Sequence, residues 1–294
     1  MLSRARALAL LAAAPLVVSC GRGSDTVTVG SKNFTEELIL GELYAQVLEH
    51  AGIAVTRKLN LGTTDIAMAA LKRGEIDLYP EYTGTALLNV LHLPPDGDAQ
   101  RVYRNVKAAY ENQFGLVWLA PSPMNDTQAL ATTQAVAGRY ALGALSDLAA
   151  KANELRLGAV PEFITRADGL PGLQKKYGGF KFKATKIVDN GLKYQALEHG
   201  DVDVIIAFST EGQLKANNLV VLEDNKHLFP PYHVAPVVRK AALDAKPALA
   251  KPLNDLAPLL TNDVMQNLNL QVDGPQKREP ADVARDFLKQ NGLG

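Results

Sequence analysis

The sequence predicts an α/β protein with two similar lobes and a ligand cleft between them. The first observation is an internal repeat: residues 71–85 and 197–211 each read as a helix end, a glycine, an acidic turn, an apolar strand, an aromatic residue and small hydroxyl residues. The matching positions are Leu71 and Leu197, Gly74 and Gly200, Asp77 and Asp203, and Tyr82 and Phe208. Because ligands of open α/β sheets bind at the carboxyl ends of strands, the aromatic residues of both copies are expected at the cleft.

The second observation is the alternation of strands and helices at the start of the chain. Strands are expected at 27–30, 53–59 and 76–82, with helices between them. Asn33 and Glu36 have the spacing of a capping box, which favours a helix start there, and Gly74 is placed to end the second helix. This order predicts a mostly parallel sheet with helices on its faces.

The third observation is a pair of proline-containing connections, at 120–126 and 229–233. They divide the chain into lobe I, at residues 27–125 and 233–294, and lobe II, at residues 126–232. Lobe I is completed by a helix at 102–111, strands at 116–119 and 234–238, and C-terminal helices. Lobe II is expected to hold helices near 146–154 and 169–177 and extended segments at 156–160 and 220–222, besides its copy of the repeat.

Composition and charge are those of an ordinary globular protein. Hydrophobic residues make up 47% of the 294 positions, and 31 basic residues balance 31 acidic ones. This length is enough for two domains. With no net charge and no basic run, a nucleic-acid partner is not expected. We expect a monomer without a cofactor.

The first twenty residues read as an export signal. The apolar run at 7–18 follows a short basic start and is too short to span a bilayer. Residues 17–21 read Val-Val-Ser-Cys-Gly, which resembles a bacterial lipobox with Val17 in place of the commoner leucine. Residues 1–20 are therefore expected to be a lipoprotein signal peptide, with Cys20 lipidated and the protein anchored to a membrane in the periplasm or at the cell surface. Cleavage by the general signal peptidase, which would leave a free protein, is the alternative.

Two basic residues lie where an anion could bind. Lys32 stands in a turn before a helix N-terminus, where free N–H groups favour negative charge. Arg166 precedes another helix and could hold a carboxylate with two hydrogen bonds. The plainer interpretations are a solvated lysine and a surface ion pair of Arg166 with Asp168 or Glu162, and the ion pair is favoured.

Three aromatic residues, Tyr82, Phe208 and Tyr232, lie at predicted strand ends or connections. The faces of aromatic rings attract quaternary ammonium groups. Core packing is the usual role of such residues, but the repeat brings Tyr82 and Phe208 to matching points of the two lobes.

No catalytic or metal-binding pattern is present in the sequence. The five histidines show no metal-ligand spacing, and neither a Gly-x-Ser-x-Gly motif nor a P-loop occurs. Nothing in the sequence favours an enzyme.

Three motifs in order carry a resemblance to a known family: Gly-Ser-Lys-Asn-Phe-Thr-Glu at 30–36, Tyr-Pro-Glu-Tyr-Thr-Gly-Thr at 79–85, and the run from 201 to 211. The chain resembles the substrate-binding proteins of ABC importers for glycine betaine, choline and related osmoprotectants. The resemblance implies a two-lobed periplasmic-binding-protein fold of type II with two crossover connections and a cleft between the lobes. It also implies a permease partner, an aromatic box for the ligand's trimethylammonium group, and basic and hydroxyl residues around its carboxylate.

By motif, the residues that match the family's carboxylate-binding positions are Lys32, Thr85 and Arg166. Tyr82 and Tyr232 match two walls of its aromatic box. The full predicted set of ligand-binding residues is Lys32, Asn33, Tyr82, Thr85, Asp126, Gln128, Arg166, Phe208 and Tyr232.

Two members of this set depart from the family pattern, because Phe208 and Gln128 stand where tyrosines are usual. Phenylalanine keeps a ring face, whereas glutamine has none, and each lost face is worth about 0.5–2 kcal/mol of binding. Either binding is weak, or the ligand is larger and Gln128 hydrogen-bonds to its extra polar atoms.

The sequence thus predicts an exported solute receptor that closes around a quaternary-ammonium compound and delivers it to an ABC permease. Three alternatives stay open: the same fold with another ligand, such as carnitine, ergothioneine or an amino acid; a sensor subunit without transport; and an enzyme built on this fold.

Overall fold

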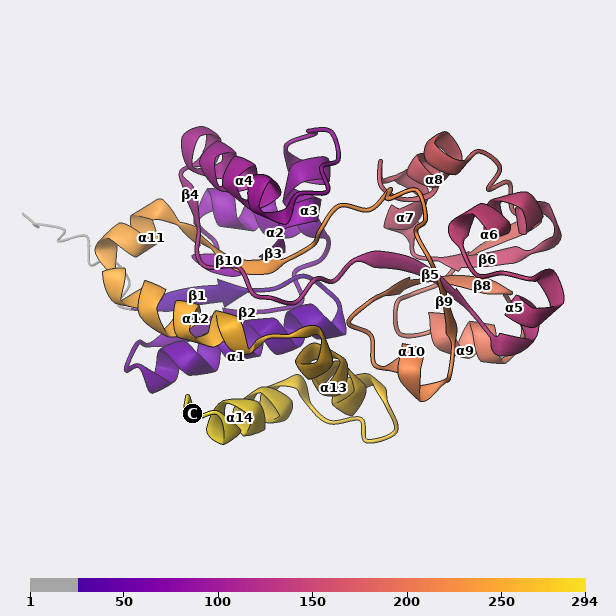
Figure 1. Cartoon of the computed structure of the whole chain (residues 1–294). Coiled ribbons are helices and arrows are strands. Elements are labelled where there is room, and N and C mark those ends of the chain that lie inside the picture. The colour runs from indigo at the N-terminus through magenta and orange to yellow at the C-terminus, as the bar shows by residue number, and fades with distance from the viewer. Residues whose placement is uncertain (1–25) are drawn as a thin grey trace, which may run out of the picture.

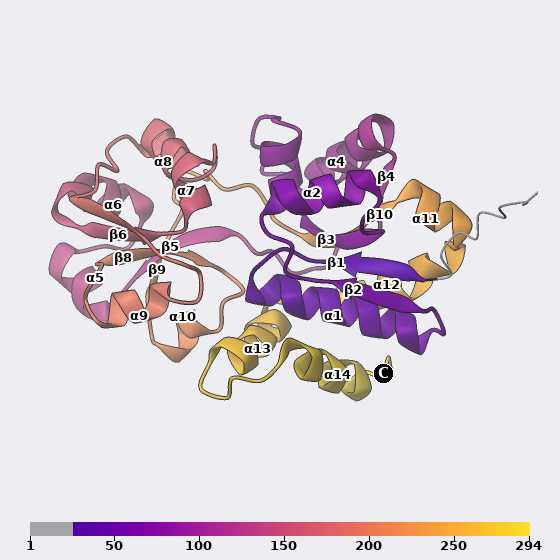
Figure 2. The same cartoon turned by 180° about the vertical axis from the view of Figure 1, so that it is seen from behind.

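The computed structural model describes residues 26–294 and contains two five-stranded sheets, each covered by helices on both faces (Figure 1; Figure 2). The predicted signal peptide and the lipidation site at Cys20 lie outside the described residues. The mixed α/β architecture with two sheets confirms the predicted fold class.

The first sheet has the strand order β2-β1-β3-β10-β4. Its strands are β1 (Val27–Gly30), β2 (Val55–Lys58), β3 (Leu78–Tyr82), β4 (Leu116–Trp118) and β10 (Val234–Arg239). β1 pairs in parallel with β2 and β3, whereas β10 runs antiparallel between β3 and β4. The sheet therefore joins the start of the chain to a strand that arrives much later.

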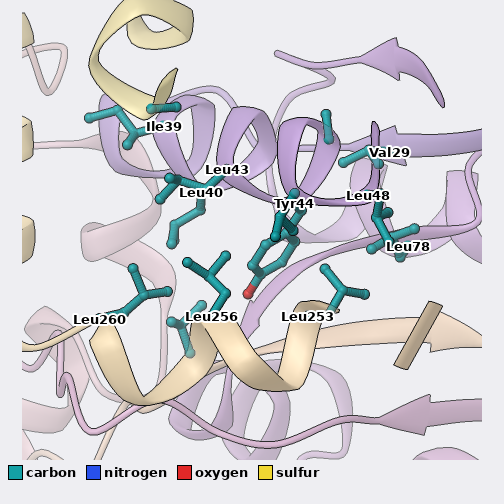
Figure 3. Close-up of a cluster of buried hydrophobic side chains, with 14 of the residues drawn as sticks. Val29, Ile39, Leu40, Leu43, Tyr44, Leu48, Leu78, Leu253, Leu256 and Leu260 are labelled. Carbon is teal, nitrogen blue, oxygen red and sulfur yellow. The ribbon is translucent and has the colours of Figure 1, made fainter. Parts of the chain in front are cut away.

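Helices from both ends of the chain cover this sheet. They are α1 (Thr35–His50), α2 (Thr64–Arg73), α3 (Thr83–Thr85) with a π-helical turn at Ala86–Val90, α4 (Ala99–Phe114), α11 (Lys240–Ala245), α12 (Ala250–Leu256), α13 (Asn262–Asp273) and α14 (Pro280–Gln290). Short 3₁₀ turns lie at Pro247–Leu249 and Ala257–Leu259. Leu43 and Tyr44 of α1 pack against Leu253 and Leu256 of α12 in a fully buried cluster (Figure 3). Because α1 is enclosed by β1, α12, α13 and α14, its first turn is held in a fixed place.

The second sheet has the order β7-β6-β8-β5-β9. Its strands are β5 (Gln128–Thr132), β6 (Arg156–Ala159), β7 (Ala184–Ile187), β8 (Val204–Phe208) and β9 (Val220–Leu222). Its helices are α5 (Gln134–Tyr140), α6 (Leu145–Lys151), α7 (Pro161–Thr165), α8 (Leu170–Tyr177), α9 (Lys193–Glu198) and α10 (Gln213–Ala216), with a 3₁₀ turn at Ala152–Glu154. β5 runs antiparallel to β8 and β9, and β6 pairs in parallel with β7 and β8.

The sequence repeat corresponds to a structural repeat. Gly74 and Gly200 both end their helices in the left-handed conformation, with φ of 73° and 70°. The carboxylates of Asp77 and Asp203 each accept a backbone N–H of the neighbouring strand at 2.8 Å. Each connection then brings an antiparallel strand to the end of the repeat strand: Val234 of β10 pairs with Tyr82, and Gln128 of β5 pairs with Phe208. The exact lobe boundaries at 125/126 and 232/233 stay predictions.

The predicted capping box at Asn33 is wrong. Helix α1 begins at Thr35, and no side chain caps it. Glu37, not Glu36, reaches back and accepts the Lys32 backbone N–H at 2.9 Å. Glu36, in the first turn of α1, instead lines a cavity between the two sheets.

Several elements were not anticipated from the sequence, among them β5, α5, α7, β7, α10, and α3 with the π-helical turn after it. β5 reads Gln-Ala-Leu-Ala-Thr, which lacks the β-branched and aromatic residues that signal a strand. β7 is an exposed edge strand, so it carries no hydrophobic alternation.

Candidate functional site

A cavity of about 490 Å³ lies between the two sheets at the ends of β3 and β8. Its volume falls within the range of about 300–1,000 Å³ that is usual for small-molecule sites. All nine predicted site residues line it: Lys32, Asn33, Tyr82, Thr85, Asp126, Gln128, Arg166, Phe208 and Tyr232. Their roles toward a ligand stay predictions.

On the wall formed by the first sheet, Lys32 is buried between carboxylates and an aromatic ring. Its Nζ donates to Glu81 Oε1 at 2.8 Å and lies 3.5 Å from Glu37 Oε1. The same ammonium stands 4.5 Å from the centroid of the Tyr82 ring. Burial alone would lower the pKa of Lys32, but the charges of Glu81 and Glu37 raise it above its ordinary value. Lys32 is therefore a paired cation.

The wall formed by the second sheet repeats this arrangement with different residues. The ammonium of Lys193 lies 4.8 Å from the centroid of the Phe208 ring and donates to Glu211 Oε1 at 2.5 Å. Glu211 Oε2 also accepts the Tyr194 hydroxyl at 2.5 Å. Lys193 is not among the residues predicted from the sequence, because it lies outside the repeated segment 197–211 that indicates Phe208. At the end of each repeat, a buried lysine thus makes a cation–π contact with the aromatic ring and an ion pair with a glutamate.

Asp168 is the centre of a buried polar network at one end of the cavity. The Arg166 guanidinium donates to its two oxygens at 2.9 and 2.7 Å. Gln128 Nε2 donates to Asp168 Oδ2 at 2.5 Å and to the Tyr232 hydroxyl oxygen at 3.1 Å, and the Tyr232 hydroxyl donates to the same Oδ2. Burial would raise the pKa of Asp168, but Arg166 brings it below its ordinary value.

The ion pair of Arg166 with Asp168, the favoured interpretation of the sequence, is confirmed, although it is a buried pair rather than a surface one. Neither Lys32 nor Arg166 is a free cation in this structure. Either could take a ligand carboxylate only by sharing or exchanging its present partner.

The remaining predicted residues differ in exposure. Asn33 is exposed and holds its loop through a backbone N–H bond to Gly62. Thr85 is buried next to the π-helical turn. Asp126 is buried and accepts the Thr210 hydroxyl at 2.6 Å. Gln128 uses its amide nitrogen as described above, and its Oε1 takes none of the hydrogen bonds found among residues 26–294.

Within residues 26–294, no group of three or more His, Cys, Asp or Glu side chains is placed to hold a metal ion. No helix in the described part of the chain is both long and apolar enough to cross a membrane.

Residues 25–290 match the family model for the substrate-binding domain of the ABC-type glycine betaine transport system. A glycine-betaine-binding protein of Pseudomonas aeruginosa is 38% identical over 293 residues, covering 96% of this chain and 93% of that protein. An ergothioneine transport permease/ergothioneine-binding protein of Helicobacter pylori is 36% identical over 269 residues. The match covers 91% of this chain and 48% of the Helicobacter protein, so the chain spans about half the length of that relative.

Among solved structures, a crystal structure described as a glycine betaine/carnitine/choline ABC transporter superimposes with a TM-score of 0.76 at 31% identity. The superposition covers 91% of this chain and 99% of the other.

Proposed function

Because this chain belongs to the family of substrate-binding domains of ABC-type glycine betaine transport systems, we propose that it is the solute receptor of an ABC importer and binds a quaternary-ammonium compound. The observation that carries the proposal is the pair of rings, Tyr82 and Phe208, at matching strand ends on the two walls of one cavity. A trimethylammonium group is attracted by such ring faces and by the carboxylates beside them.

The proposed mechanism is closure of the two halves around the ligand. Cavity-lining residues come from both sheets and from the two connections, so a ligand that touches both walls stabilises the closed arrangement. The permease would recognise that closed form. We further propose export of the protein to the periplasm or cell surface, a lipid anchor at Cys20, and a monomeric receptor.

A second candidate is a larger ligand with hydrogen-bond donors. Gln128 lines the cavity, and its Oε1 takes none of the hydrogen bonds found among the described residues, so this oxygen can accept a hydrogen bond from a ligand. The Helicobacter relative named for ergothioneine makes that compound the first one to test.

Calorimetric titration of the purified receptor with glycine betaine, choline, carnitine, ergothioneine and proline tests both candidates. Saturable binding of at least one quaternary amine is the expected result. Binding of proline alone would contradict the proposal. Uptake of the bound compound by cells, lost on deletion of the receptor gene, separates an importer from a sensor that does not transport.

Removing a ring from either wall is expected to weaken binding. Tyr82→Leu and Phe208→Leu should each cost about 1–2 kcal/mol or more, roughly five- to thirtyfold in Kd, because a ring face and its apolar contact are both lost. Tyr103→Leu is the matched control, since Tyr103 does not line this cavity. Unchanged Kd values in both cavity variants would show that the rings serve only the core.

Freeing Arg166 from its counter-ion is expected to favour zwitterionic ligands. In Asp168→Asn the guanidinium loses its carboxylate partner, while the oxygen of the new side-chain amide can still accept from Tyr232. The ratio of glycine betaine affinity to choline affinity should rise by about tenfold, because a charged hydrogen bond to a carboxylate is worth about 1.5–3 kcal/mol. A ratio that does not move would mean that Arg166 is out of reach of the ligand's carboxylate.

A further inference from the structure

Two buried carboxylates that line the cavity, Glu36 and Asp126, have no cationic partner among the described residues. Glu36 comes from the first turn of α1 and is 5% exposed, and Asp126 comes from the first connection and is 8% exposed. Glu36 accepts the Tyr82 hydroxyl at 2.7 Å and the Asn269 side-chain nitrogen at 2.8 Å. Neither carboxylate takes part in any ion pair among residues 26–294.

The cations near the cavity are already neutralised by other carboxylates. The pairs are Lys32 with Glu81, Arg166 with Asp168, and Lys193 with Glu211. In the part of the chain that the structure describes, no buried basic side chain around the cavity is left to compensate Glu36 and Asp126. Burial raises the pKa of both carboxyl groups; repulsion by Glu36 adds to the rise at Asp126, and repulsion by Glu211 adds to it at both.

An independent observation at the same place also indicates a missing donor. Asn269 is 3% exposed and lines the cavity, and its Oδ1 has no hydrogen-bond partner within the described residues. Its Nδ2 donates to Glu36 and to the Thr210 carbonyl oxygen at 3.0 Å. Because the Thr210 carbonyl oxygen can only accept, the orientation of the amide is fixed, and Oδ1 is the acceptor left without a donor. A buried acceptor without a donor is costly.

We propose that Glu36 and Asp126 make this cavity selective for net-cationic quaternary amines that carry a hydrogen-bond donor, over zwitterionic betaines. This rests on the proposed function and names the class of its ligand. A cationic alcohol such as choline supplies the positive charge that the two carboxylates lack and an O–H for a free acceptor. A betaine adds its own carboxylate to a cavity whose described basic side chains already pair with other carboxylates, so part of its binding energy is lost to repulsion.

The test compares three ligands of similar shape by calorimetry: choline, glycine betaine and 3,3-dimethylbutan-1-ol, the neutral carbon analogue of choline. Choline is expected to bind at least about tenfold more tightly than either of the others, as a buried charge–charge contact implies. This comparison needs no variant and therefore does not depend on how a mutant folds.

Two isosteric variants then test whether Glu36 and Asp126 cause this selectivity. Glu36→Gln and Asp126→Asn should each reduce choline affinity by about tenfold while changing glycine betaine affinity by less than about threefold or raising it. Asp224→Asn is the matched control: Asp224 accepts a tyrosine hydroxyl, as Glu36 does, but does not line the cavity.

The proposal is overturned if glycine betaine binds as tightly as choline or more tightly, and if neither variant changes the ratio of the two affinities. In that case Glu36 and Asp126 do not set selectivity, and the proposed function stays intact. Failure of every quaternary amine to bind overturns both.

Discussion

Replacing Lys32 by methionine is expected to destabilise the protein by about 3–5 kcal/mol, because it leaves a carboxylate unpaired in the interior. Glu81 is fully buried and Lys32 is 3% exposed, so water cannot take over the role of the ammonium. The free energy of unfolding is measured by urea titration of both proteins.

Lys186→Met is the control for that experiment. Lys186 and Asp201 form an ion pair of 2.6 Å in which both side chains are about half exposed, and such pairs are worth about 0–1 kcal/mol. Adding Glu81→Gln to Lys32→Met should recover part of the loss, since the uncompensated charge is then gone. If Lys32→Met is as stable as Lys186→Met, the buried pair contributes nothing to the fold.

The second large effect is a loss of stability as pH rises from about 4.5 to 8. Burial raises the pKa of Glu37 from 4.5 to about 8. The folded state therefore keeps a proton that the unfolded chain has already released in this window. Its contribution to stability is fully present below about pH 4.5 and is lost as pH rises toward 8, at roughly 1.4 kcal/mol per pH unit at most.

Glu37→Gln removes this titration, so the stability of the variant should fall less than that of the wild type between pH 5 and 8. Urea unfolding at several pH values in that window gives the two slopes. Equal slopes would show that Glu37 stays ionised, held by the Lys32 ammonium 3.5 Å away.

Most of the fold could be predicted because its signals are local in the sequence. The α2 helix and its glycine end, the β3 and β8 strands and the return of β10 to the first sheet all follow from short patterns. β5 could not be predicted, since Gln-Ala-Leu-Ala-Thr has no strand signature. It becomes a strand because β8 and β9 supply backbone partners on both sides, and that is information held elsewhere in the chain.

Sequence motifs predict which residues line the cavity, but they do not predict which of the charged side chains form ion pairs with one another. Lys32 looked like a free cation, because its partner Glu81 lies 49 positions away and reaches it only through the β1–β3 pairing. Lys193 lies before Phe208 on a different element and gave no signal at all. Asp168, two residues from Arg166, was visible as a partner, but the convergence of Gln128 and Tyr232 on it depends on the second connection.

The place of β10 inside the first sheet sets an order of assembly for the newly made chain. Val234 pairs with Tyr82, which was synthesised 152 residues earlier, whereas all five strands of the second sheet lie between residues 128 and 222. Pairing across such a separation is slow, because a long loop must close before any contact forms. The second sheet can therefore form before β10 is available to pair with β3 and β4. Until residue 239 has emerged, the edges of β3 and β4 that will bind β10 stay unpaired and open to association with other chains. The cavity also takes Asn269 and Asp273 from α13, so its wall is complete only after residue 273 has emerged.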